Sequence, residues 1–187
     1  MEKTKKNPFL QSAVIGLKLL LICAVVATVV AFVYELTLEK ANENINRTKS
    51  EKICEIFDMD GLMMEIKEES EDAIVYNVKD SEGKLIGYCA ETASPGFGGD
   101  ISILVGYDEK ASIVGVRIVN MSETPGVGSK VDTEDYLKQY AQKSGALALN
   151  EDVDAISGAT ISSNALMDGV NKATAALVKA LGEGGAQ

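Results

Sequence analysis

The chain has 187 residues, of which 46% are hydrophobic and 25% charged, so it can form one packed domain with a small appendage. Its formal net charge of −10 argues against nucleic acid as a partner, because such binding depends on cationic contacts to phosphate. The lack of histidine excludes imidazole metal ligands and histidine general bases. The cysteines Cys23, Cys54 and Cys89 form no C-x-x-C pair, which favours three buried free thiols over a disulfide framework or a metal site.

Residues 13–34 are predicted to form a membrane-spanning helix. The run from Leu19 to Tyr34 contains no charged residue, glycine or proline, and only Lys18 separates it from the apolar residues 13–17. A spanning helix needs about 20 apolar residues, and a lysine near its end can extend its amine to the interface. The alternative, a cleaved signal peptide, would have a shorter apolar region followed by small residues at a cleavage site.

The flanking charges predict the orientation of this helix. Three lysines precede it within residues 1–12, whereas Glu35 and Glu39 follow it. By the positive-inside rule, the N-terminus is expected in the cytoplasm and the rest of the chain on the extracytoplasmic side. The sequence thus predicts a single-pass protein of the inner cell membrane.

Residues 35–60 are predicted to form a helical linker that lifts the following domain off the membrane. Charged and apolar residues alternate at helical spacing from Glu35 to about Phe57, without proline. The segment Asp58-Met59-Asp60-Gly61 then predicts a turn.

Residues 61–187 are predicted to form an α+β domain, an antiparallel sheet with helices packed on one face. Strands in two hairpins are expected at residues 73–78, 84–92, 101–107 and 112–119. One helix is expected from Asp132 to about Gly145. Another is expected from Ser163 to Leu181, with a stripe of apolar residues at three- and four-residue spacing.

Two loops in this domain have the composition of a ligand site. In the segment Ser122–Lys130, Pro125 fixes one backbone angle while two glycines allow close approach of the main chain, although an ordinary turn has the same composition. The segment Asp154–Ser163 leads into the last helix, whose free N–H groups could receive a phosphate. A serine acting as a plain helix cap, Ser162 or Ser163, is the alternative explanation.

The second loop resembles the flavinylation motif of the FMN-binding domains found in the Rnf and Nqr respiratory complexes. The resemblance rests on Asp-x-x-Ser-Gly-Ala-Thr at residues 154–160, followed by Ser162 and Ser163. The upstream Glu-Thr-Pro-Gly-Val-Gly at 123–128 and the strand-and-loop pattern at 98–106 resemble the same family. In that family, the threonine of the Ser-Gly-Ala-Thr run carries FMN through a phosphoester bond that a dedicated flavin transferase makes.

The resemblance implies that Thr160 is the covalent attachment site for FMN. Other residues expected near the cofactor are Ser157, Gly158, Ala159, Ser162, Glu123, Thr124, Pro125, Gly126, Gly128 and Lys130. Asp154 is expected either to be recognised by the transferase or to bond its own backbone as an ordinary loop aspartate. No catalytic residue of the protein's own is implied, because flavin supplies the redox chemistry.

The length of the chain favours the G subunits of Rnf complexes, which are ion-translocating ferredoxin:NAD⁺ oxidoreductases, over the C subunits of Nqr. The resemblance then implies an electron relay that docks through its single helix against other membrane and peripheral subunits of the complex. Two further functions stay open, a stand-alone membrane-tethered flavin reductase and a flavin-free adaptor.

Overall fold

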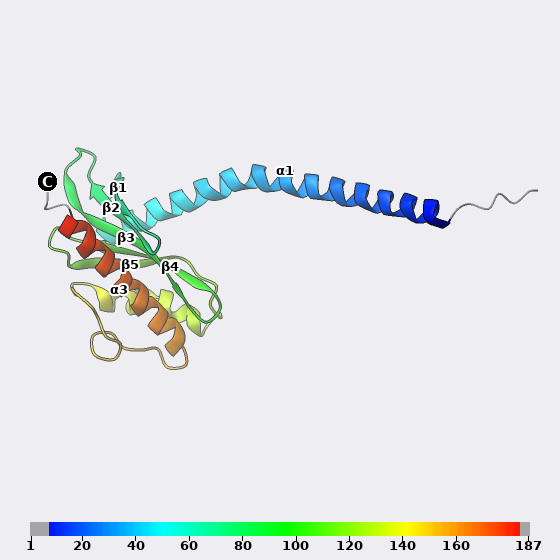
Figure 1. The fold of residues 1–187 in the computed structure, drawn as a ribbon. Helices are drawn as coiled ribbons and strands as arrows, with labels where there is room; N and C mark the ends of the chain where they lie inside the picture. The colour runs from blue at the N-terminus through cyan, green and yellow to red at the C-terminus, as the bar shows by residue number, and fades with distance from the viewer. Residues whose placement is uncertain (1–7, 184–187) are drawn as a thin grey trace, which may run out of the picture. The chain divides into compact units, whose positions relative to one another are not determined.

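The structure is a computed structural model that describes residues 8–183, with the side chains of residues 15–35, 37 and 44–182 (Figure 1). Helix α1 runs from Pro8 to Phe57. The chain divides within this helix, after Asn46, into an N-terminal unit and a C-terminal unit that begins at Arg47.

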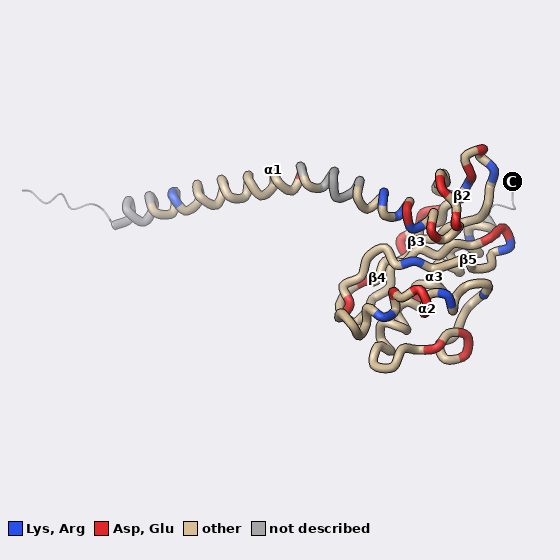
Figure 2. Tube along the Cα trace, turned by 180° about the vertical axis from the view of Figure 1, so that it is seen from behind, with Lys and Arg blue, Asp and Glu red and all other residues tan. Residues whose placement is uncertain are grey.

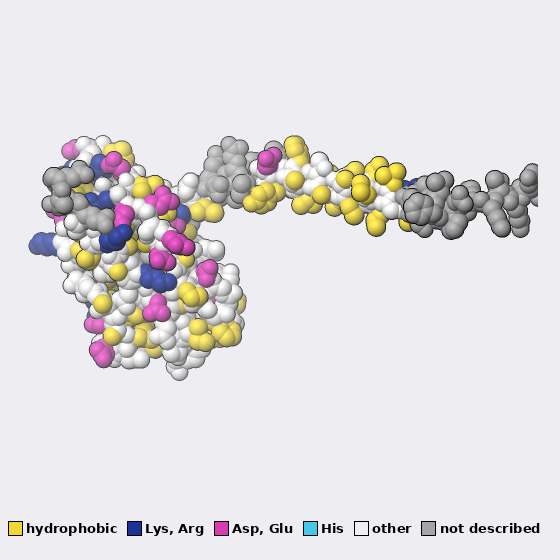
Figure 3. Space-filling model, viewed as in Figure 1, with side chains coloured by type: hydrophobic (Ala, Val, Ile, Leu, Met, Phe, Trp, Pro, Cys, Tyr) yellow, Lys and Arg dark blue, Asp and Glu magenta, His cyan; other side chains and the backbone are white. Residues whose placement is uncertain are grey.

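Among its described residues, the N-terminal unit contains one apolar helical segment, Ile15–Glu35, whose 21 residues have a mean hydropathy of 2.6 and no buried side chain. Hydrophobic side chains follow the described part of the helix in Figure 3. By length and composition this segment can cross a membrane, and it agrees with the predicted span at residues 13–34 to within two residues. Cys23 lies exposed in it and Cys54 is only half-buried, so the expectation of three buried thiols was wrong for both and holds for Cys89 alone.

The C-terminal unit is built on a five-stranded antiparallel sheet in which each strand pairs with the next along the chain. The strands are β1 (Met63–Glu69), β2 (Ala73–Lys79), β3 (Leu85–Pro95), β4 (Asp100–Tyr107) and β5 (Ile113–Asn120). Two hairpin turns are closed by aspartates. The carboxylate of Asp80 accepts from the N–H groups of Glu82 and Lys84. After β4, the carboxylate of Asp108 accepts from the N–H groups of Lys110 and Ser112. Acidic residues mark several turns of this unit in Figure 2. The four predicted strands and the α+β class are confirmed.

Strand β1 was not predicted from the sequence. Its residues alternate poorly between apolar and charged types, and its first four side chains are exposed. It lies at the edge of the sheet and pairs with β2 alone, with a bulge between Ile66 and Glu68. An edge strand with little buried surface leaves a weak hydrophobic pattern, which is why it escaped prediction.

Both faces of the sheet are covered, which corrects the expectation of helices on one face. In β4, Ile103 and Val105 pack in the core beneath α3 (Thr160–Glu183), whereas Leu104 packs against Ile53 and Ile56 near the end of α1. Successive strand residues point to opposite faces, so the two helices lie on opposite sides. Residues 47–57, part of the predicted linker, therefore belong to the C-terminal unit.

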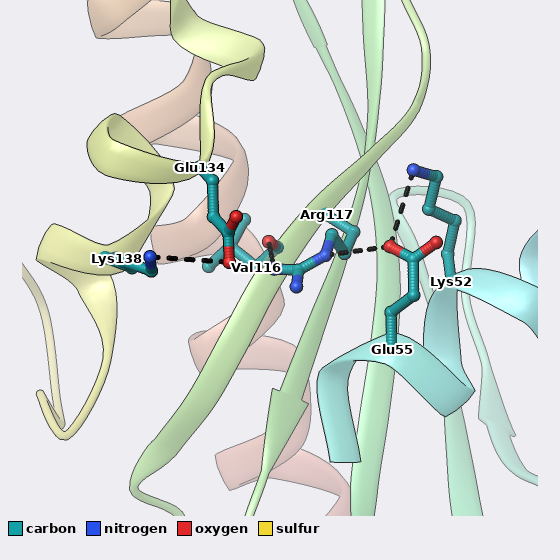
Figure 4. A network of polar contacts seen from close by, with 6 residues as sticks. All are labelled: Lys52, Glu55, Val116, Arg117, Glu134 and Lys138. Carbon is teal, nitrogen blue, oxygen red and sulfur yellow. Dashed lines mark hydrogen bonds and ion pairs between the residues drawn. The ribbon is translucent and has the colours of Figure 1, made fainter. Parts of the chain in front are cut away.

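Ion pairs join the end of α1 to the sheet. The carboxylate of Glu55 lies 3.1 Å from Nε of Arg117 on β5 and 3.5 Å from Nζ of Lys52 (Figure 4). Nζ of Lys49 lies 2.7 Å from the carboxylate of Glu91 on β3. Pairs as exposed as those of Glu55 contribute about 0–1 kcal/mol each, so the buried isoleucines supply more of the attachment.

Helix α3 packs closely on the other face. Gly169 faces Ile103, and a Cβ on this glycine would collide with the isoleucine. The hydroxyl of Thr92 on β3 donates to the carbonyl of Gly169 at 3.0 Å, and the hydroxyls of Tyr107 and Thr174 lie 3.0 Å apart. The predicted apolar stripe is the buried face of this helix. The close approach fixes α3, and hence its N-terminus, against the sheet.

The predicted helix from Asp132 to Gly145 was wrong. The chain there forms three short turns of helix, η1 (Gly128–Asp132), α2 (Glu134–Leu137) and η2 (Lys138–Tyr140). Beyond them, the N–H of Gln142 donates to the carbonyl of Ile113 at 2.7 Å, and the N–H of Ile113 donates to the carbonyl of Lys143 at 2.8 Å. These bonds to the start of β5 use backbone groups that a continuing helix would need.

Candidate functional site

The two loops singled out in the sequence meet at a pocket of about 430 Å³. Its walls come from the loop after β3, the loop after β5 and the first turn of α3. The lining residues are Phe97, Glu123, Thr124, Val127, Gly128, Gly158, Ala159, Thr160, Ile161 and Ser162. The volume falls in the range of pockets that bind cofactors and other small molecules.

Helix α3 begins at Thr160, three residues earlier than predicted. Its first helical hydrogen bond runs from the N–H of Ser163 to the carbonyl of Ala159, at 2.9 Å. The N–H groups of residues 160–162 therefore have no acceptor within the helix, and they carry the positive end of its dipole. The side chain of Thr160 is exposed at this end of the helix.

Ser162 and Ser163 lie inside the helix, so the explanation of either as a plain helix cap was wrong. The Ser163 hydroxyl accepts from the N–H of Ile156 at 3.1 Å and holds the preceding loop against the helix. The Ser162 hydroxyl is buried and donates to Oε2 of Glu123 at 2.7 Å. Both serines thus fix the pocket wall.

Glu123 joins the three walls of the pocket. Besides the bond from Ser162, its Oε1 accepts from the N–H groups of Phe97 at 2.8 Å and Gly98 at 3.2 Å. Burial of this carboxyl acts to raise its pKa, but the hydrogen bonds from Ser162, Gly98 and Phe97 outweigh that effect and hold the pKa below its usual value. The carboxylate is therefore ionised at neutral pH.

Gly128 leaves room for the Glu123 carboxylate. A Cβ at residue 128 would collide with Oε2 of Glu123 and would lie 2.7 Å from the Ser162 hydroxyl oxygen. We therefore expect Gly128→Ala to lower the free energy of unfolding by about 1–3 kcal/mol, as overpacking does in other cores. Thermal denaturation monitored by circular dichroism measures the change.

Gly182→Ala is the matched control for this prediction. Gly182 is helical and exposed, with nothing within 4 Å of a built Cβ, so alanine there should be neutral or stabilising by up to about 1 kcal/mol. Equal midpoints for Gly128→Ala and wild type would contradict the steric argument.

The structure brings together most of the predicted site residues, but not all. Five of them do not line the pocket: Pro125, Gly126, Lys130, Asp154 and Ser157. Gly126 has a φ of +76°, which favours glycine, and its N–H donates to the Ser129 hydroxyl. Its role is therefore to form the turn. Lys130 and Asp154 are exposed, and the N–H of Asp154 donates to the side chain of Gln139.

Three apolar residues of the pocket were missed from the sequence. Phe97, Val127 and Ile161 line it with 71%, 45% and 55% of their surfaces exposed. Each stands among glycines or hydroxyl residues in a loop or first helical turn, where an exposed apolar side chain has no packing role. That contrast between an apolar side chain and its glycine or hydroxyl neighbours was the available signal, and it indicates a ligand with an apolar surface.

Comparisons with known proteins agree with this geometry. Residues 96–175 match the family model of the FMN-binding domain. The chain is 37% identical over 105 residues to the G subunit of the ion-translocating oxidoreductase complex of Methanosarcina acetivorans, covering 54% of this chain and 56% of that protein. It is 28% identical over 181 residues to the G subunit of the Na(+)-translocating ferredoxin:NAD(+) oxidoreductase complex of Acetobacterium woodii. This alignment covers 84% of this chain and 87% of that protein.

Among solved structures, NqrC of Shewanella oneidensis aligns with a TM-score of 0.47 and 26% identity over 55% of each chain. The FMN-binding domain match includes both pocket loops and the start of α3. Residues 96–175 thus resemble an FMN-binding domain, and the chain is similar to G subunits of ion-translocating oxidoreductase complexes, spanning about half the length of the Methanosarcina acetivorans subunit.

Proposed function

We propose that this chain is the electron-carrying G subunit of a membrane-bound, ion-translocating ferredoxin:NAD⁺ oxidoreductase, with FMN bound covalently to Thr160. The observation that carries the proposal is the place of Thr160. It is the first residue of α3, exposed, at the edge of a pocket that both family motifs line. A phosphoester on its hydroxyl would put the phosphate beside the free N–H groups of the first helical turn.

The pocket residues fit a flavin. Phe97, Val127 and Ile161 offer apolar surface to a ring system, and Gly158 leaves open space beside Thr160. Flavin brings one- and two-electron chemistry of its own when bound. The protein's share of the work is then to hold the ring and to set its environment.

The proposed topology follows from the sequence. Residues 13–34 span the inner membrane, residues 1–12 are cytoplasmic, and residues 35–60 lead to an extracytoplasmic FMN-binding domain at 61–187. A flavin transferase would attach the FMN and would recognise Asp154 in the motif. Other membrane and peripheral subunits of the complex would deliver and accept the electrons.

The test is to produce the full-length chain in cells with and without a flavin transferase. With the transferase, we expect a fluorescent band on a denaturing gel under ultraviolet light and an intact mass increased by one FMN less water. Without it, the band should be dark and the mass unmodified. A dark band from transferase-containing cells would refute the covalent attachment and favour a flavin-free adaptor.

A further inference from the structure

Glu123 is the only ionised side chain on the described lining of the pocket. Of its ten lining residues, none is Lys, Arg or Asp, and Glu123 is the single glutamate. Its side chain is largely buried, with 8% of the residue exposed. The charge therefore stands beside the pocket with little water to screen it.

The position of this charge is fixed by the protein. The three groups that donate to the carboxylate come from residues 97, 98 and 162, which belong to two different walls of the pocket. The glycines at 96 and 128 leave space for its two oxygens, since a Cβ at either would collide with one of them. A charge held this way does not reorient when the ligand changes its own charge.

Resting on the proposed function, we propose that Glu123 lowers the reduction potential of the flavin held in the pocket. Reduction of the oxidised ring by two electrons takes up either one proton, which leaves the ring negatively charged, or two protons, which leave it neutral. A fixed carboxylate raises the free energy of the charged product. In a titration with dithionite as the electron donor, the wild-type flavin is then harder to reduce.

The variant Glu123→Gln removes the charge and keeps the shape. Its amide oxygen can still accept from the N–H groups of Phe97 and Gly98, and its amide nitrogen can donate to the Ser162 hydroxyl oxygen. At a fixed potential, we expect the ratio of reduced to oxidised flavin to rise about tenfold. A neighbouring charge commonly shifts the pKa of a titrating group by about one unit, which is the same tenfold change in an equilibrium constant. For a two-electron couple this is a midpoint about 30 mV higher.

Ser162→Ala is the matched control, because it deletes one hydrogen bond to the carboxylate and keeps the charge. It should lower the unfolding midpoint, because one buried hydrogen bond is lost, yet change the ratio of reduced to oxidised flavin by less than about threefold. If both variants shift the potential equally, loosening of the pocket explains the effect and the proposal fails.

The measurement is a spectroelectrochemical titration of the full-length protein in detergent, purified from cells that contain the transferase. Gel fluorescence of the same samples separates the two proposals. A dark wild type refutes covalent flavin binding, whereas three fluorescent proteins with equal potentials refute only the role of Glu123. A Glu123→Gln protein that folds but stays unloaded would show that the carboxylate serves loading, and would also overturn the inference.

A second variant covers the case in which Glu123→Gln does not fold. Val127 lines the same pocket, is 45% exposed and donates no hydrogen bond to the carboxylate, so Val127→Lys adds a positive charge to the lining and keeps the groups that donate to Glu123. It should raise the potential relative to Val127→Gln. Equal potentials for these two variants would overturn the inference.

Discussion

Replacing Thr160 with alanine is expected to abolish the covalent flavin completely while leaving the fold intact. The proposed phosphoester needs the Thr160 hydroxyl, and no other atom of alanine can replace it. The side chain is exposed, and the bond that residue 160 makes to the Asn164 amide uses its backbone carbonyl. The free energy of unfolding should therefore change by no more than about 0.5 kcal/mol.

The other two hydroxyls of the pocket are poorer attachment sites. Ser162 is 2% exposed, and its hydroxyl donates to Glu123. Thr124 is exposed but belongs to the loop after β5, so it is not part of the first turn of α3 with its free N–H groups. Thr124→Ala is therefore the matched control, a threonine removed from the same pocket.

Gel fluorescence and intact mass show whether each of three variants carries covalent flavin. The Thr160→Ala protein should be dark and unmodified, Thr160→Ser should retain flavin because the hydroxyl is kept, and Thr124→Ala should be fluorescent. Fluorescence that persists in Thr160→Ala, or disappears in Thr124→Ala alone, would assign the attachment to a different residue.

The second large effect is expected at Ile53. This side chain is 1% exposed and packs with Ile56 and Leu104 between the end of α1 and the sheet. Truncation to alanine removes buried methyl groups and leaves a cavity, which costs about 2–5 kcal/mol in comparable cores. For a unit of this size, the unfolding midpoint should fall by roughly 10 °C.

Ile45→Ala is the control, since Ile45 lies in the same helix but is 46% exposed. Its midpoint should stay close to that of wild type in circular dichroism of the detergent-solubilised protein. If Ile53→Ala and Ile45→Ala unfold at the same temperature, residues 47–57 act as a simple linker and their packing contributes nothing to stability.

The elements that the sequence predicted well are those with a strong local pattern. Strands β2 to β5 have apolar runs bounded by turn residues, and α3 has its buried stripe at three- and four-residue spacing. The segment after Asp132 also looked helical, because nothing local reveals that Gln142 and Lys143 bond to the start of β5. Long-range hydrogen bonds overrode local propensity there.

In the candidate site, too, some features could be predicted from local sequence and others depend on long-range contacts. The two loops stood out by their composition, the role of Thr160 was predicted through a family resemblance, and the structure brings those loops together at one pocket. The part played by Glu123 could not be found from the sequence, because its partners lie 25, 26 and 39 residues away along the chain. A buried carboxylate can be assigned a role only when its donors are known.

The two-sided sheet has a consequence for how such proteins diversify. The core beneath α3 and the core beneath the end of α1 share no residue, because alternate side chains of each strand serve different faces. Substitutions in one layer can thus accumulate with little penalty in the other. A lineage can exchange the N-terminal part of α1 for a different sequence, provided that apolar residues remain at positions 53 and 56, and inherit the pocket unchanged.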